Sequence, residues 1–166
     1  MRELKKFLKE KYRKNLWLLQ FVFLCCFIFT SSELFPAEIL SSDNEERIRN
    51  ILKLYCKYYS NEDAQSYKSL FTARAQIATI FPNGKLFVLS LDDFIYTQEH
   101  YFDEADVSME TFENIRVDLT GNVARVVADY SLVDQDGTST GKDYFTLIKE
   151  DNSWKILFLL FTNDEN

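Results

Sequence analysis

The C-terminal part of the chain alternates β-type runs with polar turns, and this pattern constrains the fold more than any other feature. Apolar, β-branched and aromatic residues dominate three consecutive runs, at 123–133, 141–149 and 154–162. Short stretches rich in Gly, Asp, Thr, Asn and Ser separate them. Such runs pair antiparallel with their neighbours in sequence. The sequence therefore predicts an antiparallel meander, with residues 134–140 as a turn and a further strand at 109–119 that pairs with the first run.

Helical patterns precede the meander. Ser42 and Glu45 have the spacing of a capping box, and Ser90 and Asp93 repeat that spacing farther along. Apolar residues then recur every three or four positions, which places them on one helix face. We expect helices from Ser42 to about Ser60 and from Ser90 to about 102. We also expect a short helix after Asn61 in which the following residues share a face: Tyr67, Leu70 and Phe71.

A β-hairpin is expected between the second and third helices. Residues 77–81 and 86–89 are apolar runs, and Asn83-Gly84 lies between them. Asn-Gly supplies the positive φ angles that a tight hairpin turn requires. Helices therefore come first and most of the sheet last, which predicts an α+β fold with helices on one face of an antiparallel sheet.

The last strand is apolar on both of its faces. Alternation puts two sets on opposite sides of the sheet: Trp154, Ile156, Phe158 and Leu160 on one, and Leu157, Leu159 and Phe161 on the other. Both sides must therefore be covered. The helices provide one cover, and a partner subunit in a homodimer is our expectation for the other.

Residues 1–32 have the order of an export signal. Seven Lys and Arg residues precede an apolar run at 16–29, and small polar residues follow it. Fourteen helical residues span about 21 Å, short of a bilayer core, but the bulky side chains would let an uncleaved segment stay in the membrane through residues 16–32. We expect a signal peptide or membrane anchor at 1–32, a linker at 33–42, one domain at 43–162 and a tail at 163–166. The domain would then be periplasmic, secreted or membrane-anchored.

The charge distribution argues against nucleic-acid binding. Of 19 basic and 26 acidic residues, seven basic and two acidic ones precede residue 33. The remaining chain is strongly acidic and would repel a phosphate backbone. No basic stripe interleaved with aromatic residues offsets this excess.

Catalytic and metal-binding motifs are absent from the sequence. It contains no Gly-rich phosphate loop, no Gly-x-Ser-x-Gly, no His-Glu-x-x-His and no Cys-x-x-Cys. His100 is the only histidine, so no zinc site and no cofactor are expected. It is expected at the surface near a helix end, with a role as a base at a pocket mouth as the alternative. Cys56 is expected to be a small buried hydrophobe on its helix rather than a reactive thiol.

Strand parity separates two acidic residues of the meander. Arg125 and Asp129 fall opposite the apolar set of their strand and are expected to face solvent. Asp143 shares a face with Phe145 and Leu147. A charge on the apolar face of a strand is costly unless it lines a polar cavity, so Asp143 is the better candidate for a pocket.

The order of helix, short helix, hairpin, helix and long meander, with the closing words Gly-x-Asp-Tyr-Phe-Thr-Leu-Ile-Lys and Ser-Trp-Lys-Ile, resembles the nuclear transport factor 2-like superfamily. Within it the chain looks most like SnoaL-like and putative lumazine-binding-type domains, over about residues 43–162. The resemblance implies a cystatin-like roll, in which a curved antiparallel sheet wraps around N-terminal helices to form a cone-shaped pocket. It also implies frequent dimers.

Three functions remain open at this point. The leading hypothesis is an exported or membrane-tethered domain whose cone binds a small apolar or aromatic ligand without catalysis. Its pocket residues would be Tyr55, Tyr59, Tyr101, Asp143 and Trp154. The alternatives are an acid–base enzyme of the isomerase, cyclase or dehydratase type, using Asp143, His100 and Tyr59, and a module for dimerisation or protein interaction. Each aromatic candidate could instead simply fill the core.

Overall fold

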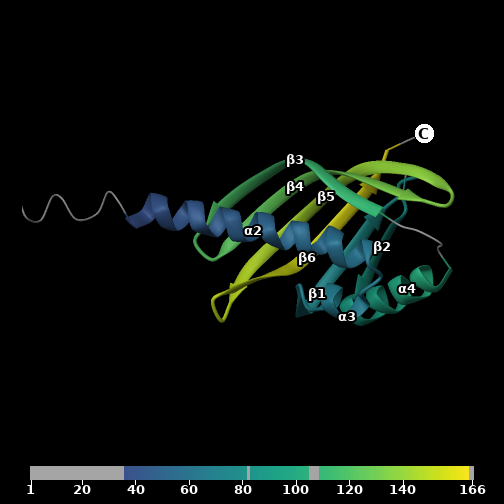
Figure 1. Cartoon of the computed structure of the whole chain (residues 1–166), viewed down its shortest axis with the longest axis horizontal. Helices are drawn as coiled ribbons and strands as arrows, with labels where there is room; N and C mark the ends of the chain where they lie inside the picture. The colour runs from purple at the N-terminus through teal and green to yellow at the C-terminus, as the bar shows by residue number, and fades with distance from the viewer. Residues whose placement is uncertain (1–35, 82, 105–108, 165–166) are drawn as a thin grey trace, which may run out of the picture. The chain divides into compact units, whose positions relative to one another are not determined.

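The computed structural model describes residues 36–81, 83–104 and 109–164 (Figure 1). By its contacts the chain divides after Ser42, and the fold below is that of the unit beginning at Asp43. The elements, in chain order, are α2 (Pro36–Ser60), α3 (Ala64–Lys68), β1 (Phe71–Ile80), β2 (Leu86–Ser90), α4 (Leu91–Glu104), β3 (Met109–Thr120), β4 (Val123–Asp134), β5 (Gly137–Glu150) and β6 (Ser153–Asn163).

The predicted signal or anchor segment at 1–32 lies outside the described residues. Among the residues that are described, no helix is both long enough and apolar enough to cross a membrane.

Helix α2 begins at Pro36, so the predicted start at Ser42 is wrong, and residues 36–42 of the expected linker are helical. Proline is well tolerated in the first turn of a helix. Two ion pairs, each between residues four positions apart, stabilise the helix just after Ser42: Arg47 with Asp43 at 3.0 Å and Arg49 with Glu45 at 2.7 Å. The Glu45 carboxylate therefore pairs with Arg49 rather than with a backbone N–H, as a capping box would require.

The other helix starts and the apolar stripes are confirmed. Ser90 Oγ accepts a hydrogen bond from the backbone N–H of Asp93 at 3.2 Å, and Asp63 Oδ1 accepts one from Ser66 at 3.0 Å. Helix α2 buries one face at Ile48, Leu52, Tyr55 and Tyr59, and helix α4 buries Phe94, Ile95 and Phe102. These stripes form the helical half of the core.

The predicted helical face of Tyr67, Leu70 and Phe71 is wrong for its last two members. Helix α3 ends at Lys68, and Phe71 already pairs with Ile156 as the first residue of β1. All three side chains are buried, so the apolar signal was real, but three residues do not distinguish a helix from a short extended run. Strand β1 thus begins six residues before the predicted Ile77.

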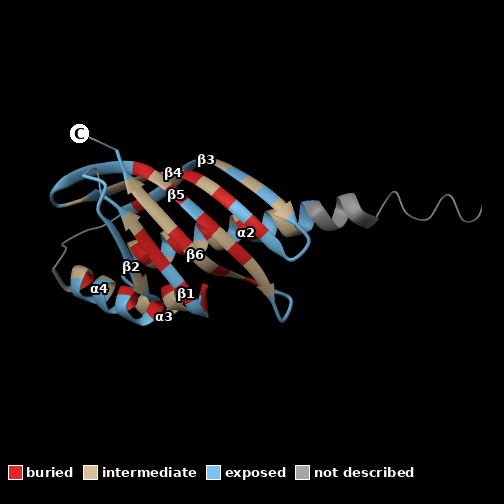
Figure 2. Ribbon diagram, turned by 180° about the vertical axis from the view of Figure 1, so that it is seen from behind, coloured by how far each residue is buried: buried red, intermediate tan, exposed pale blue. Residues whose placement is uncertain are grey.

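The described strands form one six-stranded sheet in the order β2-β1-β6-β5-β4-β3. The hairpin of β1 and β2 and the meander of β3 to β6 are antiparallel, as predicted. The pair of β1 and β6 is parallel, which the sequence analysis did not anticipate. It brings the first and the last strand together inside the sheet, and Figure 2 shows buried residues in the inner strands β1, β6, β5 and β4.

Strand β5 is longer than predicted because its hairpin turn is tight. Asp134 pairs with Gly137, which leaves only Gln135 and Asp136 in the turn, and Gly137 has a φ of 132°. The run of Thr and Ser residues at 138–140 is therefore strand and not loop. This extension carries β5 past the end of the apolar core.

A bulge in β6 changes which residues share a face. Thr146 pairs with Phe158 but Leu147 pairs with Ile156, so Leu157 is an extra residue in the ladder. The face that holds Trp154 and Ile156 continues with Leu159 and not, as predicted, with Phe158 and Leu160. A second bulge lies in β3 beside Asn114, whose φ is 50°. Bulges bend their strands, and the sheet curves accordingly around α2 (Figure 1).

The side of the sheet away from α2 keeps apolar groups in solvent. Tyr144, Leu160, Ala78 and Val88 pair across four neighbouring strands; Tyr144 and Val88 at the two ends are 38% and 52% exposed, Leu160 is partly exposed and Ala78 is buried. A homodimer that covers this row stays a prediction.

We predict that Gly141→Ala strongly destabilises the protein. A Cβ at this position would lie 1.8 Å from the backbone oxygen of Thr162 and 2.7 Å from the Tyr130 ring. Backbone cannot move aside cheaply, so we expect a loss of about 2 kcal/mol or more in the free energy of unfolding, measured by urea denaturation.

Thr138→Ala, at an exposed position of the same strand, is the matched control and should change the stability by less than about 0.5 kcal/mol. Equal stability of the two variants would contradict the close approach of β6 and Tyr130 to Gly141.

Candidate ligand-binding cavity

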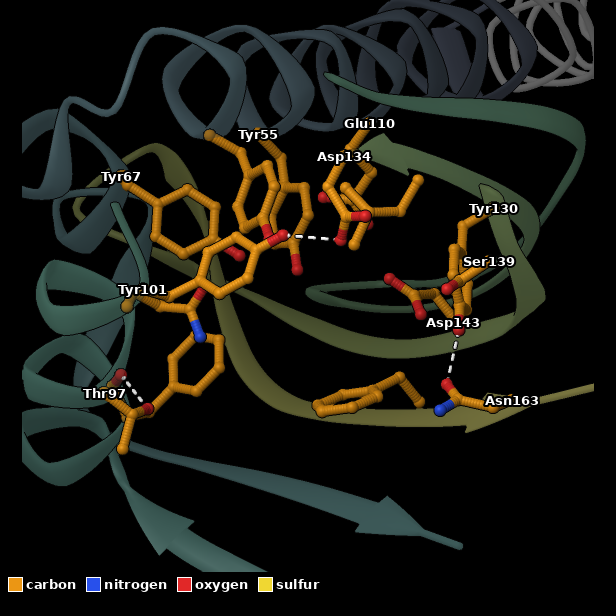
Figure 3. A pocket seen from close by; sticks show the side chains of 15 residues that line it. Tyr55, Tyr67, Thr97, Tyr101, Glu110, Tyr130, Asp134, Ser139, Asp143 and Asn163 are labelled. Atoms are coloured by element: carbon orange, nitrogen blue, oxygen red, sulfur yellow. Dashed lines mark hydrogen bonds between the residues drawn. The ribbon is translucent and has the colours of Figure 1, made fainter. Parts of the chain in front are cut away.

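The concave side of the sheet encloses a cavity of ≈ 400 Å³ that is partly open to solvent (Figure 3). Its size is that of sites for small organic molecules. The described residues that line it come from the helices and from strands β3 to β6: Tyr55, Tyr59, Tyr67, Phe94, Thr97, Gln98, Tyr101, Glu110, Tyr130, Leu132, Asp134, Ser139, Asp143, Phe161 and Asn163.

Five tyrosines form what we call the tyrosine wall: Tyr55, Tyr59, Tyr67, Tyr101 and Tyr130. The rings of the first four contact one another across α2, α3 and α4, and Tyr130 comes from β4. The ring centroids of Tyr55 and Tyr67 are 4.7 Å apart, and those of Tyr59 and Tyr101 are 6.4 Å apart with an interplanar angle of 27°. Tyrosine combines an apolar ring with a polar tip, so the wall presents both flat surfaces and hydroxyl groups to the cavity.

Two acidic side chains from different strands are buried at the cavity. Asp143 on β5 is 2% exposed and Glu110 at the start of β3 is 9% exposed. Asp143 lies on the same strand face as the inward-facing Phe145, and Glu110 lies on the same face as Phe112, so strand geometry directs both acids inward. In Figure 3 the carboxyl group of Asp143 points into the cavity.

Burial controls the ionisation of these two acids. Loss of hydration raises the pKa of Glu110 well above its usual range, and the nearby Asp143 raises it further. Burial also raises the pKa of Asp143, to about 8. With no cation among the described lining residues to stabilise them as carboxylates, both groups favour the protonated form at neutral pH. A protonated carboxyl group donates a hydrogen bond as well as accepting one.

The tyrosine hydroxyls have different partners. Tyr101 donates to Asp134 at 2.7 Å, which holds the pKa of Asp134 below its usual range. Tyr130 donates to Asn163 Oδ1 at the other side of the cavity. The Tyr67 hydroxyl is fully buried and makes no hydrogen bond of normal geometry with any described residue, although the Tyr55 hydroxyl is its polar neighbour. A buried hydroxyl without a partner is costly, so a ligand that hydrogen-bonds to Tyr67 would recover that free energy.

Four of the five pocket residues proposed from the sequence line this cavity: Tyr55, Tyr59, Tyr101 and Asp143. Trp154 does not. It lies near the start of β6, and its indole N–H donates to Asn44 Oδ1 of α2 at 3.2 Å. Trp154 is thus a core residue with a satisfied polar group, the reading that the sequence left open for each aromatic candidate.

His100 lies on the exposed side of α4, where its ring contacts Tyr96 at a centroid distance of 4.9 Å. It is not among the lining residues, so the structure does not bring the trio of Asp143, His100 and Tyr59 together. Asp143 and Tyr59 share the cavity without it. The surface placement expected for His100 is confirmed.

Sequence reasoning missed Glu110, Tyr67 and Tyr130 as site residues. Tyr67 is predicted on an apolar helix face, and Tyr130 belongs to the apolar set opposite Arg125 and Asp129, but nothing in their spacing distinguishes the lining of a cavity from solid core. The sequence did contain a signal for Glu110, because this acid shares an apolar strand face with Phe112. The missing information was that β3 pairs there with Leu132 at the open end of the sheet.

Other sequence expectations concern metals and thiols. No group of three or more His, Cys, Asp or Glu residues in the described part of the chain has the geometry of a metal site. Cys56 is half-buried and not fully buried as predicted, and burial with the nearby Glu110 and Asp143 raises the pKa of its thiol, which disfavours the reactive thiolate.

Comparison with known proteins agrees with this architecture. The family model described as "Putative lumazine-binding" matches residues 43–162. No curated protein matches the chain by sequence.

Several solved structures have the same fold. A Mycobacterium tuberculosis protein of unknown function is 17% identical, with a TM-score of 0.67 over 81% of this chain and 79% of that one. A putative dehydratase of the NTF2-like family from Streptomyces avermitilis is 12% identical, with a TM-score of 0.65 over 76% and 99%. A Nostoc punctiforme protein of unknown function with a cystatin-like fold is 11% identical, with a TM-score of 0.61 over 74% and 92%. At these identities the likeness shows the fold alone.

We predict that Asp143→Asn stabilises the protein at pH 8. The pKa of Asp143 is higher in the folded state, about 8, than its ordinary value of 3.8. The folded state therefore binds more protons between these values, and stability falls as the pH rises from about 4 to about 8. Asparagine cannot ionise, so urea denaturation at pH 4, 6 and 8 should show a flatter profile and a gain of roughly 1–3 kcal/mol at pH 8.

Glu110→Gln should change the profile in the same direction. Asp129→Asn is the control, because the bond from Lys142 lowers the pKa of this exposed carboxyl and its loss gives no gain at pH 8. A lower stability of Asp143→Asn at pH 8 would show that the carboxylate is stabilised in the folded state.

Proposed function

The chain belongs to the family described as putative lumazine-binding, within the nuclear transport factor 2-like superfamily, and on this premise we propose that it is a binding protein for a small ring-containing molecule. The ligand would lie in the cavity with its ring against the tyrosine wall and its polar groups toward Glu110 and Asp143. Non-catalytic binding is the activity that the site supports best.

The observation that carries this proposal is the combination of open volume with costly polar burial. The cavity of ≈ 400 Å³ has room for a bicyclic ring, and flat aromatic faces surround it. Two protonated acids and the hydroxyl of Tyr67 supply hydrogen-bonding groups that the protein itself leaves unused. A solid core would favour apolar side chains at these positions.

An acid–base enzyme is the second candidate, and one specific observation favours it. The pKa of Asp143 is raised to about 8, close to the pH at which a general acid or base works best. Glu110 and the tyrosine hydroxyls could serve as proton donors beside it. The Streptomyces avermitilis relative is named as a putative dehydratase, which is a statement about that protein. Turnover of a bound ligand, lost in Asp143→Asn, would distinguish this candidate from simple binding.

We also propose that the domain acts outside the cytoplasm, either released or attached to the membrane. The proposal rests on residues 1–32, where positive charge precedes an apolar run. The location determines which compartment supplies the ligand and does not affect the assignment of the cavity.

We predict that the full-length protein binds lumazine and that Ser139→Phe abolishes binding. Ser139 lines the cavity, so a phenyl group there would occupy the ligand volume. Thr138→Phe places the same group on the adjacent residue, outside the cavity lining, and should leave binding unchanged. Quenching of lumazine fluorescence on titration would measure the dissociation constants.

Equal affinity of both phenylalanine variants would place the bound lumazine elsewhere on the protein. If neither lumazine nor a panel of comparable ring compounds binds to the wild type, the proposed function is wrong.

The location is tested by fusing alkaline phosphatase, which is active only after export, behind residue 166. We expect activity in bacterial cells, and loss of it when residues 16–29 are deleted. The same fusion inactive with the intact N-terminal segment would contradict export.

A further inference from the structure

The cavity is unusual in the sign of its charges. Glu110, Asp143 and Asp134 contribute three carboxyl groups to its lining, and none of the described lining residues is Lys, Arg or His. No described ion pair involves Glu110 or Asp143. A ligand with a carboxylate or phosphate group would find no cation among these residues and would be repelled by the carboxylate of Asp134.

We propose that the ligand is an organic cation, an amine carried on a ring or a short alkyl chain, bound with its ammonium group between Glu110 and Asp143 and its carbon skeleton against the tyrosine wall. This inference rests on the proposed function and specifies the ligand class of the same cavity.

The position of the two acids supports a cationic partner. Burying two carboxyl groups at one cavity costs free energy, because each loses hydration and Asp143 also opposes the ionisation of Glu110. An ammonium group between them would replace the lost hydration with attraction and hydrogen bonds. Carboxylates are the strongest hydrogen-bond acceptors in the cavity for the N–H groups of such a ligand.

The Tyr67 hydroxyl is a second and independent observation. It is fully buried, lines the same cavity and has no partner among the described residues. Its oxygen could accept a hydrogen bond from an ammonium group. In Figure 3 Tyr67 and Tyr55 lie beside each other at one side of the cavity, and Asp143 lies across from them.

The tyrosine wall also suits a cation. The face of an aromatic ring attracts positive charge, and several tyrosines around one space form the usual setting for an alkylammonium group. The contacts among Tyr55, Tyr59 and Tyr67, with ring centroids 4.7 and 5.9 Å apart, hold these rings in fixed orientations. Their positions would therefore not have to be ordered on binding.

The approach to the cavity has the same sign of charge. Asp134 is partly exposed, and the Tyr101 hydroxyl keeps its pKa low, so it is a carboxylate at neutral pH. The chain as a whole carries a formal charge of -7. Such a field raises the local concentration of cations and accelerates their encounter with the site.

Binding of a cation has a measurable proton balance. The free cavity holds protonated acids, whereas the complex holds an ammonium and at least one carboxylate, so a proton passes to the buffer. The other ionisable groups facing the acids are the tyrosine wall, Asp134 and the Cys56 thiol. The raised pKa values of the tyrosines and of the thiol keep them neutral near pH 7, and Asp134 is already ionised. A neutral ligand would release no proton.

The test uses three molecules of similar shape and different charge: phenethylamine, phenethyl alcohol and 3-phenylpropionate. Each is titrated into the full-length protein at pH 7 by calorimetry, in two buffers of different ionisation enthalpy, which gives both affinity and protons released. We expect the amine to bind at least about tenfold more tightly than the alcohol, with proton release, and the propionate not to bind.

The variants Glu110→Gln and Asp143→Asn should each weaken amine binding about tenfold or more, and leave alcohol binding within about threefold. Both variants are expected to fold, since they remove a buried ionisable group. Ser139→Phe should abolish binding of the amine, and Thr138→Phe should not.

Two results would overturn the inference. If the alcohol or lumazine binds at least as tightly as the amine and no proton is released, the ligand is not a cation, while the proposed function stands. If none of the three probes nor lumazine binds, both fail. Amine binding that Glu110→Gln and Asp143→Asn leave unchanged would also overturn it, because the ammonium would then lie elsewhere.

Discussion

The packing of α2 into the concave side of the sheet is the contact on which the rest of the domain depends. Ile48, Leu52 and Tyr55 are buried there, and the Tyr55 ring meets Tyr67, Phe112 and Phe145 at centroid distances of 4.7, 5.5 and 5.5 Å. One aromatic side chain of the helix thus joins α3, β3 and β5. Removing so much aromatic surface from water is a large favourable term for a domain of this size.

The cavity exists because this packing does not extend to the end of the sheet. Beside Tyr55 the core is dense, but farther along β4 and β5 the sheet continues past the helix, as the tight turn at Asp134 to Gly137 requires. Tyr130 lies across from Gly141, which has no side chain, and its hydroxyl donates a hydrogen bond to Asn163.

Stability and function oppose one another in this space. Glu110 and Asp143 lower the stability of the folded protein at neutral and higher pH, because burial disfavours their charge. The protein keeps them on strands whose neighbouring inward residues are apolar. Destabilising polar groups that converge on one cavity are characteristic of sites for binding or chemistry. Tyr67, with its buried and unpartnered hydroxyl, belongs to the same group of residues.

The sequence by itself determined the elements and their class. Caps at Ser90 and Asp63, the hairpin around Gly84 and the meander after Val123 are local signals, and local hydrogen bonding and periodicity are sufficient to produce them. Parity along one strand also directed Asp143 inward, since side-chain alternation is a property of a single strand.

Tertiary structure decided what lies beside what. The parallel pairing of β1 with β6 joins residues about eighty positions apart, and no local pattern encodes it. The bulge at Leu157 reversed the predicted faces of β6 because a strand that is apolar on both sides contains no parity signal. The sequence also could not show that Glu110 and Asp143 line the same cavity. Their proximity depends on β3, β4 and β5 being in register, and only the folded sheet sets that register.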